Sequence, residues 1–213
     1  TVYGQTETSP VLTQTFPDDS EEDICNTVGQ PLPNKDIAIL DTQTSEVLPL
    51  DTIGEICSRG YCNMLRYNDN PEATKATIDA SGWLHTGDLG SMDERGYVKI
   101  TGRLKEMIIR GGENLFPAEI ENTLLEHPAV AEVAVVGIPD PKWGEIVGCF
   151  IRPVDDKPEI SELIAHCRQY LSPVKTPTKW MFVEEWPLTG SGKIQKFNLL
   201  ENFEQGAYQE ETA

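Results

Sequence analysis

Gly102-Arg103-Leu104-Lys105-Glu106 is the stretch that divides this sequence, because its two sides follow different patterns. Upstream lie short strand-like runs separated by turn-forming residues. Downstream, helical and strand-like segments alternate. The chain has 213 residues, enough for two small domains. We therefore expect a β-rich part over residues 1–102, a connection at 103–106, a second domain over 107–200 and a tail over 201–213.

The upstream part has the composition of short antiparallel strands. Asp36–Leu40 and Gly54–Ser58 are mainly apolar, and the segment between them contains Asp, Thr, Ser and Pro, which favour turns. Tyr97–Thr101 alternates apolar and polar side chains and follows a turn-forming run at Asp93–Gly96. Several strands at this short spacing predict a small barrel-like subdomain or an antiparallel sheet.

The downstream part combines helices with buried strands. Pro117 suits the first position of a helix that we expect to end at Glu126. A second amphipathic helix is indicated by apolar residues at helical spacing, namely Ile160, Leu163, Ile164, Cys167 and Leu171. Expected strands cover residues 133–136, 146–151 and 180–183. The predicted fold class is α+β, with the barrel-like subdomain followed by a compact mixed α/β domain and a polar, frayed tail.

Charge and cysteine content exclude several classes of protein. The net charge of −18 argues against nucleic acid or an anionic membrane surface as a partner. The sequence lacks a run of about 20 apolar residues, the length of a membrane-spanning helix. Five cysteines, without a Cys-x-x-Cys pair, disfavour a disulfide framework or a zinc site and favour reduced thiols. We therefore expect a cytoplasmic protein, with the mitochondrial matrix as the alternative in a eukaryote.

Two short motifs in the first half carry groups that suit a nucleotide. In Tyr3-Gly4-Gln5-Thr6-Glu7, Thr6 offers a hydroxyl to a phosphate and Glu7 offers a carboxylate to Mg²⁺. In Trp83-Leu84-His85-Thr86-Gly87-Asp88, the carboxylate of Asp88 can accept the two hydroxyls of a ribose from a loop. A capped turn and a Gly-Asp turn are the respective structural alternatives.

Three further motifs lie at or beyond the connection. Arg103 and Lys105 are two residues apart, so they would point the same way in an extended segment, toward a nucleotide or into solvent. Gly111 and Gly112 indicate a turn with positive φ, or a place where a thin ligand passes the backbone. Lys193 follows Gly-Ser-Gly and suits a flexible arm that contacts a phosphate or carboxylate, or an exposed loop.

Other catalytic patterns find no support. The region before Lys193 is not a Walker A loop, because Pro187 stands where glycine is needed. The sequence contains neither Gly-x-Ser-x-Gly nor His-Glu-x-x-His. The histidines at 85, 127 and 166 are scattered and have the positions of helix-end or surface residues.

The order of these motifs resembles the late motifs of the adenylate-forming superfamily, over the stretch from Tyr3 to about Phe197. Tyr-Gly-x-Thr-Glu, Thr-Gly-Asp, Gly-Arg-x-Lys, Gly-Gly-Glu-Asn and Pro-x-x-x-x-Gly-Lys follow one another as they do there. That superfamily contains acyl-CoA synthetases, adenylation domains of peptide synthetases and firefly-type luciferases. The stretch Gly82–Glu121 looks most similar to fatty acyl-CoA ligases of the medium-chain type.

The resemblance implies a reaction in two steps that uses ATP, Mg²⁺ and CoA. A carboxylic acid reacts with ATP to give acyl-AMP and pyrophosphate, and the thiol of CoA then displaces AMP. By the same resemblance, Tyr3, Thr6, Asp88 and Arg103 would bind the nucleotide and Glu7 would hold Mg²⁺. Lys193 would be catalytic in the first step, Lys105 would be the hinge of a mobile C-terminal domain, and Gly111 and Gly112 would line the path of CoA.

The resemblance also implies that a phosphate-binding loop and most of the acyl pocket lie upstream of Thr1. We therefore expect residues 1 to about 30 to be poorly ordered or to pair in a non-native way, and we expect the chain alone to be inactive. Acyl chain length and oligomeric state stay open.

Two alternative functions remain. One is a domain that adenylates an amino acid for a carrier protein, although only about twenty residues follow Lys193. The other is a non-catalytic binding module. A luciferase-like oxygenase finds no support in the sequence, which ends without a peroxisomal address.

Overall fold

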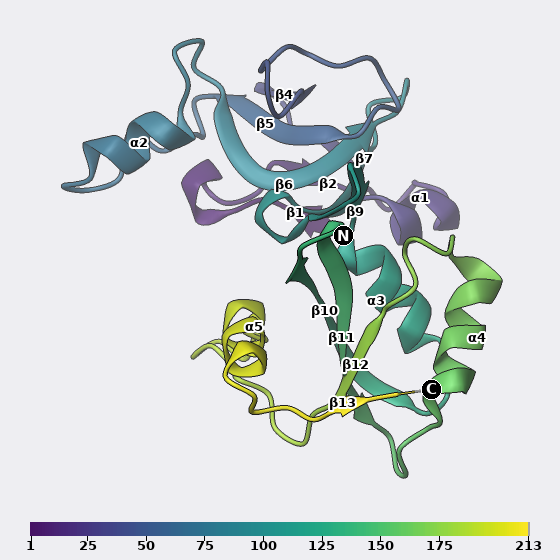
Figure 1. Ribbon diagram of the computed structural model, residues 1–213. Coiled ribbons are helices and arrows are strands. Elements are labelled where there is room, and N and C mark those ends of the chain that lie inside the picture. The colour runs from purple at the N-terminus through teal and green to yellow at the C-terminus, as the bar shows by residue number, and fades with distance from the viewer. Residues whose placement is uncertain (213) are drawn as a thin grey trace. The chain divides into compact units, whose positions relative to one another are not determined.

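The structure, a computed structural model, describes residues 1–212 and divides into two compact units (Figure 1). The first unit is Thr1–Lys105, and the second begins at Glu106. The division falls within the stretch 103–106 at which the sequence pattern changes. Within the described residues, none of the helices is both long and apolar enough to cross a membrane.

The first unit contains two antiparallel sheets. One sheet consists of β1 (Val2–Tyr3), β2 (Thr13–Gln14) and β3 (Gln30–Pro31), in that order. The other consists of β4 (Lys35–Leu40), β5 (Gly54–Gly60), β6 (Leu84–Met92) and β7 (Val98–Arg103), also in chain order. Over the described residues both sheets stay open, so the barrel-like part is β-rich without closing into a barrel.

One apolar core joins the two sheets of this unit. Tyr3 and Leu12 from the first sheet region pack in one cluster with Ile39, Ile56 and Val98 from the second. This shared core gives the N-terminal residues a place to bury apolar surface. The expectation that residues 1–30 would be disordered or pair wrongly is therefore not supported, because β1, β2 and β3 form a regular antiparallel sheet there.

Two short helices of the first unit were not predicted, although both carry recognisable N-terminal signals. α1 (Glu21–Asn26) begins after Ser20, whose Oγ accepts the backbone N–H of Asp23 at 3.1 Å. α2 (Pro71–Thr77) begins after Asn70, whose side chain accepts the N–H of Ala73, and it has proline at its first position. In Figure 1, α2 projects from the body of the first unit.

The second unit is built on one mixed six-stranded sheet. Its strands are β8 (Ile108–Arg110), β9 (Glu113–Leu115), β10 (Val130–Asp140), β11 (Gly144–Pro153), β12 (Lys179–Phe182) and β13 (Glu210–Glu211). Its helices are α3 (Pro117–Leu125), α4 (Ile160–Tyr170) and α5 (Lys196–Glu204). β11 is central, because it pairs antiparallel with β10 and β8 and parallel with β12.

Both faces of this sheet are covered, which explains the long apolar runs of β10 and β11. On β11, Cys149 and Ile151 face a core shared with α3 and α4, whereas Phe150 faces a core shared with α5. The same alternation on β10 places Val135 on the first face and Val136 on the second. Figure 1 shows α3 and α4 on one side of these strands and α5 on the other.

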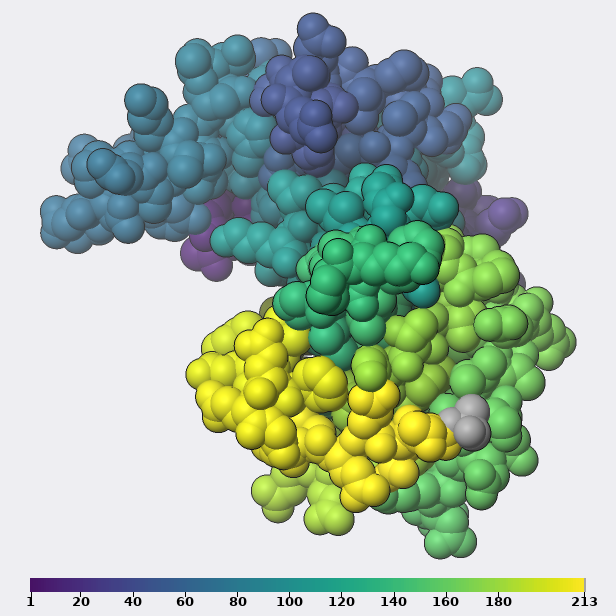
Figure 2. All heavy atoms as spheres, in the orientation of Figure 1, coloured from purple at the N-terminus to yellow at the C-terminus, as the bar shows by residue number. Residues whose placement is uncertain are grey.

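The predicted mixed α/β class is confirmed, and most expected elements of the second unit are present at nearly the expected bounds. The prediction of a frayed tail is wrong. α5 continues to Glu204, and β13 pairs antiparallel with β12, with Trp180 opposite Glu211. Figure 2 shows the C-terminal segment, in yellow, packed along one face of the second unit.

Candidate nucleotide site and its surroundings

Asp88 is the best-defined polar centre of the first unit. It lies within β6, not in the predicted loop, and the β6–β7 pairing places it directly opposite Arg103. Its Oδ1 is 3.1 Å from Nε of Arg103, and its Oδ2 accepts a hydrogen bond of 2.9 Å from the hydroxyl of Tyr3. Only 7% of Asp88 is exposed. Strand pairing brings Asp88 and Arg103 together, and packing of the other sheet places Tyr3 against them, so three of the predicted nucleotide-binding residues meet.

The carboxylate of Asp88 still has capacity for a ligand. An ionised carboxylate offers about four lone-pair positions, and Tyr3 and Arg103 each use one oxygen. Burial raises the pKa of Tyr3 well above its ordinary value, so the phenol stays protonated and keeps donating to Asp88. A pair of vicinal hydroxyls could donate to the remaining positions.

The part of β6 directly before Asp88 is tied to the neighbouring strand, β5. The hydroxyl of Thr86 donates to the carbonyl oxygen of Ile56 at 2.6 Å and accepts the N–H of Asp88 at 3.1 Å. Oε1 of Glu55 accepts the N–H of Gly87 at 2.9 Å. Gly87 has a φ of +75°, in the left-handed region that favours glycine. Other residues rarely adopt the backbone conformation that directs this N–H toward Glu55.

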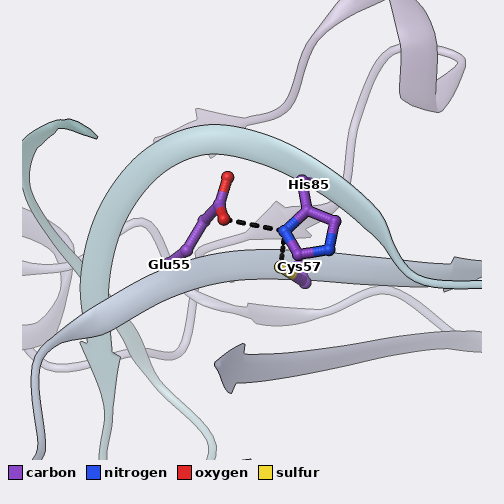
Figure 3. A group of neighbouring side chains, drawn as sticks. All are labelled: Glu55, Cys57 and His85. Atoms are coloured by element: carbon purple, nitrogen blue, oxygen red, sulfur yellow. Dashed lines mark hydrogen bonds and ion pairs between the residues drawn. The ribbon is translucent and has the colours of Figure 1, made fainter. Parts of the chain in front are cut away.

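Glu55, Cys57 and His85 form a buried cluster behind this segment (Figure 3). Nδ1 of His85 lies 2.7 Å from Oε2 of Glu55 and 3.5 Å from Sγ of Cys57. Three possible ligand atoms thus lie within 4.8 Å of one another. However, the direct Glu55–His85 contact satisfies both groups, and burial raises the pKa of Cys57, which favours the neutral thiol over the thiolate that metals bind. The cluster is best explained as support for the Thr86–Asp88 segment of β6.

The sequence did not predict this cluster. Glu55 and Cys57 are two residues apart on one strand, which was a signal that they could share a face. His85 joins them because it pairs with Cys57 across β5 and β6, next to a bulge between Glu55 and Cys57. A bulge changes the register locally, so the convergence could not be read from spacing alone.

Thr6 and Glu7 lie in a short 3-10 turn, Thr6–Thr8, directly after β1. Thr6 is exposed, and the carboxylate of Glu7 accepts a hydrogen bond of 2.9 Å from the hydroxyl of Tyr67 through Oε1. The second oxygen of Glu7 is left for another partner. Hydroxyl and carboxylate oxygens are the donor types that Mg²⁺ prefers, so this pair fits a magnesium–phosphate group chemically.

The connection between the units has a different shape from the one predicted. Arg103 ends β7, and Leu104–Glu106 forms a 3-10 turn. Arg103 and Lys105 therefore do not belong to one extended segment. The expectation that they point the same way assumed such a segment and is not supported. Arg103 contacts Asp88, whereas Lys105 is exposed.

Gly111 and Gly112 form the turn between β8 and β9, as the sequence predicted. Their φ angles are +60° and +89°, in the region that favours glycine. The N–H of Gly111 donates to the carbonyl oxygen of Trp143 at 2.7 Å, and a Cβ at position 111 would lie 3.0 Å from the Trp143 ring. The backbone is thus closely packed against an aromatic ring at this turn.

Lys193 lies in a closed hairpin, and the prediction of a loose arm is corrected. Leu188 and Ile194 pair as an antiparallel bridge, and the N–H of Gln195 donates to the carbonyl oxygen of Pro187 at 2.8 Å. Within the turn, the hydroxyl of Thr189 accepts the N–H of Lys193 at 3.0 Å. The side chain of Lys193 remains exposed. The backbone is therefore ordered while the amine is free to meet a ligand.

Residues 1–68 match the AMP-binding enzymes, and residues 119–193 match the AMP-binding enzyme C-terminal domain. The chain belongs to this superfamily of adenylate-forming enzymes. It is similar to a protein of Bacillus subtilis named as an acyl-CoA synthetase, YngI, with 46% identity over 93% of this chain and 36% of the relative. It is also similar to the medium-chain acyl-CoA ligase ACSF2, mitochondrial, of Bos taurus, with 45% identity over 95% of this chain and 33% of the relative.

A solved structure of the o-succinylbenzoate CoA synthetase of Bacillus subtilis, in complex with its acyl-adenylate intermediate, matches with a TM-score of 0.87. Its identity is 34%, and the match covers 99% of this chain and 42% of that one. The chain thus spans about a third of the curated relatives it matches.

Proposed function

We propose that this chain is the C-terminal part of an acyl-CoA ligase and contributes residues that bind the nucleotide. The whole enzyme would activate a medium-chain fatty acid with ATP and transfer it to CoA. The observation that carries the proposal is the Tyr3–Asp88–Arg103 cluster, a buried carboxylate with spare acceptor positions. It is supported by similarity to proteins named as acyl-CoA ligases and to a synthetase that forms an acyl-adenylate.

In the proposed first step, a carboxylate oxygen of the fatty acid attacks the α-phosphorus of ATP. A new P–O bond forms, the bond to the β-phosphate oxygen breaks, and pyrophosphate leaves. Negative charge builds up around the α-phosphate, where the ammonium group of Lys193 would stabilise it. Asp88 would accept the ribose hydroxyls, while Tyr3 and Arg103 hold its carboxylate in place.

Thr6 would contact phosphate and Glu7 would hold Mg²⁺, which neutralises phosphate charge when bound. Both residues sit in one 3-10 turn, so a single turn would supply the hydroxyl and the carboxylate.

In the proposed second step, the thiolate of CoA attacks the acyl carbon. A thioester bond forms, the acyl–phosphate bond breaks and AMP leaves. We propose that Lys105 is the hinge at which the second unit reorients between the steps, because it is exposed and adjoins the division between the units. The turn at Gly111 and Gly112 would then line the path of the pantetheine arm beside Trp143.

The test is AMP release by the full-length gene product with ATP, Mg²⁺ and straight-chain acids from acetate to palmitate, with and without CoA. We expect CoA-dependent AMP release that is largest for medium chains. Pyrophosphate exchange with an amino acid, and no response to CoA, would reassign the protein to carrier loading. The 213-residue chain alone is the reference, and we expect it to be inactive. We place the protein in the cytoplasm, with the mitochondrial matrix as the alternative that cell fractionation would detect.

A further inference from the structure

Lys196 forms a partly buried ion-pair network that the proposed chemistry does not use. Its Nζ lies 2.6 Å from Oε2 of Glu106 and 2.9 Å from Oε1 of Glu121. Only 22% of the Lys196 side chain is exposed. All three residues belong to the second unit, so the network is independent of how the two units are placed.

The three residues of the network lie in three different segments of the second unit. Glu106 is the first residue of the second unit and follows Lys105 directly. Glu121 is on α3, and its Oε1 also accepts the N–H of Val135 on β10 at 2.7 Å, so it is fixed to the central sheet. Lys196 is the first residue of α5 and follows Lys193 by three positions. The network therefore links the start of the unit, its sheet and the base of the Lys193 hairpin.

The chemistry of the network favours a fixed geometry. Burial lowers the pKa of Lys196, but the carboxylates of Glu121 and Glu106 outweigh this, so the pKa lies above its ordinary value and the amine stays charged. A buried charge that loses its partner is strongly unfavourable, so the three groups have few alternative arrangements. The hairpin ends at the neighbouring Gln195, whose N–H donates to the carbonyl oxygen of Pro187 and closes it.

We propose that Lys196 is a positioning residue that fixes the Lys193 hairpin to the hinge end of the second unit through Glu106 and Glu121. It deepens the proposed function, because it assumes that Lys193 acts in adenylation. Reorientation at Lys105 would then carry the hairpin with its unit, so that Lys193 arrives at a defined place. Displacement of a reacting group by about 1 Å can cost up to about 100-fold in rate.

The first test measures the hairpin itself and needs no enzymatic activity. Amide hydrogen exchange is followed in peptides covering residues 187–195 in the wild-type chain and in Lys196→Met. We expect exchange at Gly192, Lys193 and Gln195 to be at least several-fold faster in the variant. The matched control is Lys175→Met, which breaks a similar pair with Glu119 on α3 at 2.6 Å and should leave the hairpin unchanged. Equal exchange in Lys196→Met and wild type would overturn the proposal.

The second test separates the two half-reactions in the full-length gene product. We expect Lys196→Met to slow adenylation by about 10- to 100-fold in kcat, with KM for ATP within about twofold, and to spare thioester formation from supplied acyl-AMP. Lys196→Arg should restore most of the rate. Equal loss in both half-reactions would show a general structural role and overturn the proposal.

A second variant and a second outcome separate failure of this proposal from failure of folding or of the proposed function. If Lys196→Met does not fold, Glu106→Gln carries the same comparison, because Lys196 then keeps Glu121. If the wild-type protein adenylates none of the acids, the proposed function fails, whereas the exchange experiment still decides whether Lys196 fixes the hairpin.

Discussion

The surroundings of Asp88 and of Lys193 show two different ways to hold a charged group. Asp88 is buried within a strand, and both of its oxygens already have partners from other strands. Lys193 is exposed on a hairpin whose turn is closed around its backbone, because the Thr189 hydroxyl accepts the N–H of Lys193 and lies 2.9 Å from the hydroxyl of Ser191. In the proposed mechanism, the buried carboxylate of Asp88 would bind the nucleotide in both half-reactions, whereas the exposed amine of Lys193 would act in adenylation only.

Removal of the Lys193 amine should have the largest effect on activity. We expect Lys193→Ala to reduce adenylation by about 100- to 1000-fold, because one preorganised charge at the transition state is lost. Thioester formation from supplied acyl-AMP should be nearly unchanged. Pyrophosphate exchange measures the first step, and CoA-dependent AMP release from supplied acyl-AMP measures the second, with Lys99→Ala on β7 as the control. Equal loss in both steps would contradict a role in one step only.

Asp88 should behave in the opposite way. We expect Asp88→Asn to weaken nucleotide binding by about 10- to 100-fold, the usual effect of losing a hydrogen bond to a charged group. Both half-reactions should suffer, because ATP and acyl-AMP share the ribose. The measurement is KM for ATP in the first step and for acyl-AMP in the second. A defect confined to adenylation would remove the distinction between Asp88 and Lys193.

The support behind Asp88 can be tested through Glu55. Glu55→Ala leaves the N–H of Gly87 and the imidazole of His85 without their carboxylate partner. We expect a loss of about 1–3 kcal/mol in the free energy of unfolding of the first unit, and a rise of a few-fold in KM for ATP. Urea unfolding provides the first value. The control is Glu46→Ala at an exposed position, which should change neither quantity.

The two units should also differ in their response to mild acid. In the second unit, burial first and His166 second lower the pKa of His127 below its ordinary value of 6.5. A lowered pKa means that the stabilising contribution is present above pH 6.5 and is lost as the pH falls through the folded-state value. In the first unit, hydrogen bonds from Arg95 and Ser20 lower the pKa of Asp23 below 3.8, so its contribution persists to much lower pH.

We therefore expect a small loss of stability in the second unit as the pH falls below about 6.5. Hydrogen exchange under increasing urea can follow peptides from each unit separately. His127→Gln should flatten the response of the second unit. An unchanged response of the second unit in His127→Gln would show that the effect does not come from His127.

Much of the fold was predictable because it rests on local patterns. The helices at Pro117 and Ile160 and the strand at Asp36 were found from a helix-start proline or from apolar periodicity. α1 and α2 were missed because they are short and contribute little apolar periodicity, although Ser20 and Asn70 mark their starts. The pairing of β13 with β12 was missed because two residues carry no strand pattern of their own.

The site was predictable as a set of residues but not as an arrangement. Motif order identified Tyr3, Asp88 and Arg103, yet only the strand register and the packing of the two sheets show that they meet. The roles of Glu55 and Lys196 depend on partners 32 and 90 residues away in the chain, and spacing within a motif says nothing about such pairs. Long-range register and buried ion pairs are therefore what the structure adds.

The outermost strand of the second unit has a practical consequence. β13 covers the edge of β12, and ion pairs from Lys179 to Glu210 and from Lys157 to Glu211 hold it there. A polypeptide trimmed before Glu210 would present the backbone of β12 as a template for a neighbouring molecule, so it should aggregate more readily during purification. An affinity tag is better attached to the other terminus, or separated by a long polar spacer, to keep that edge closed.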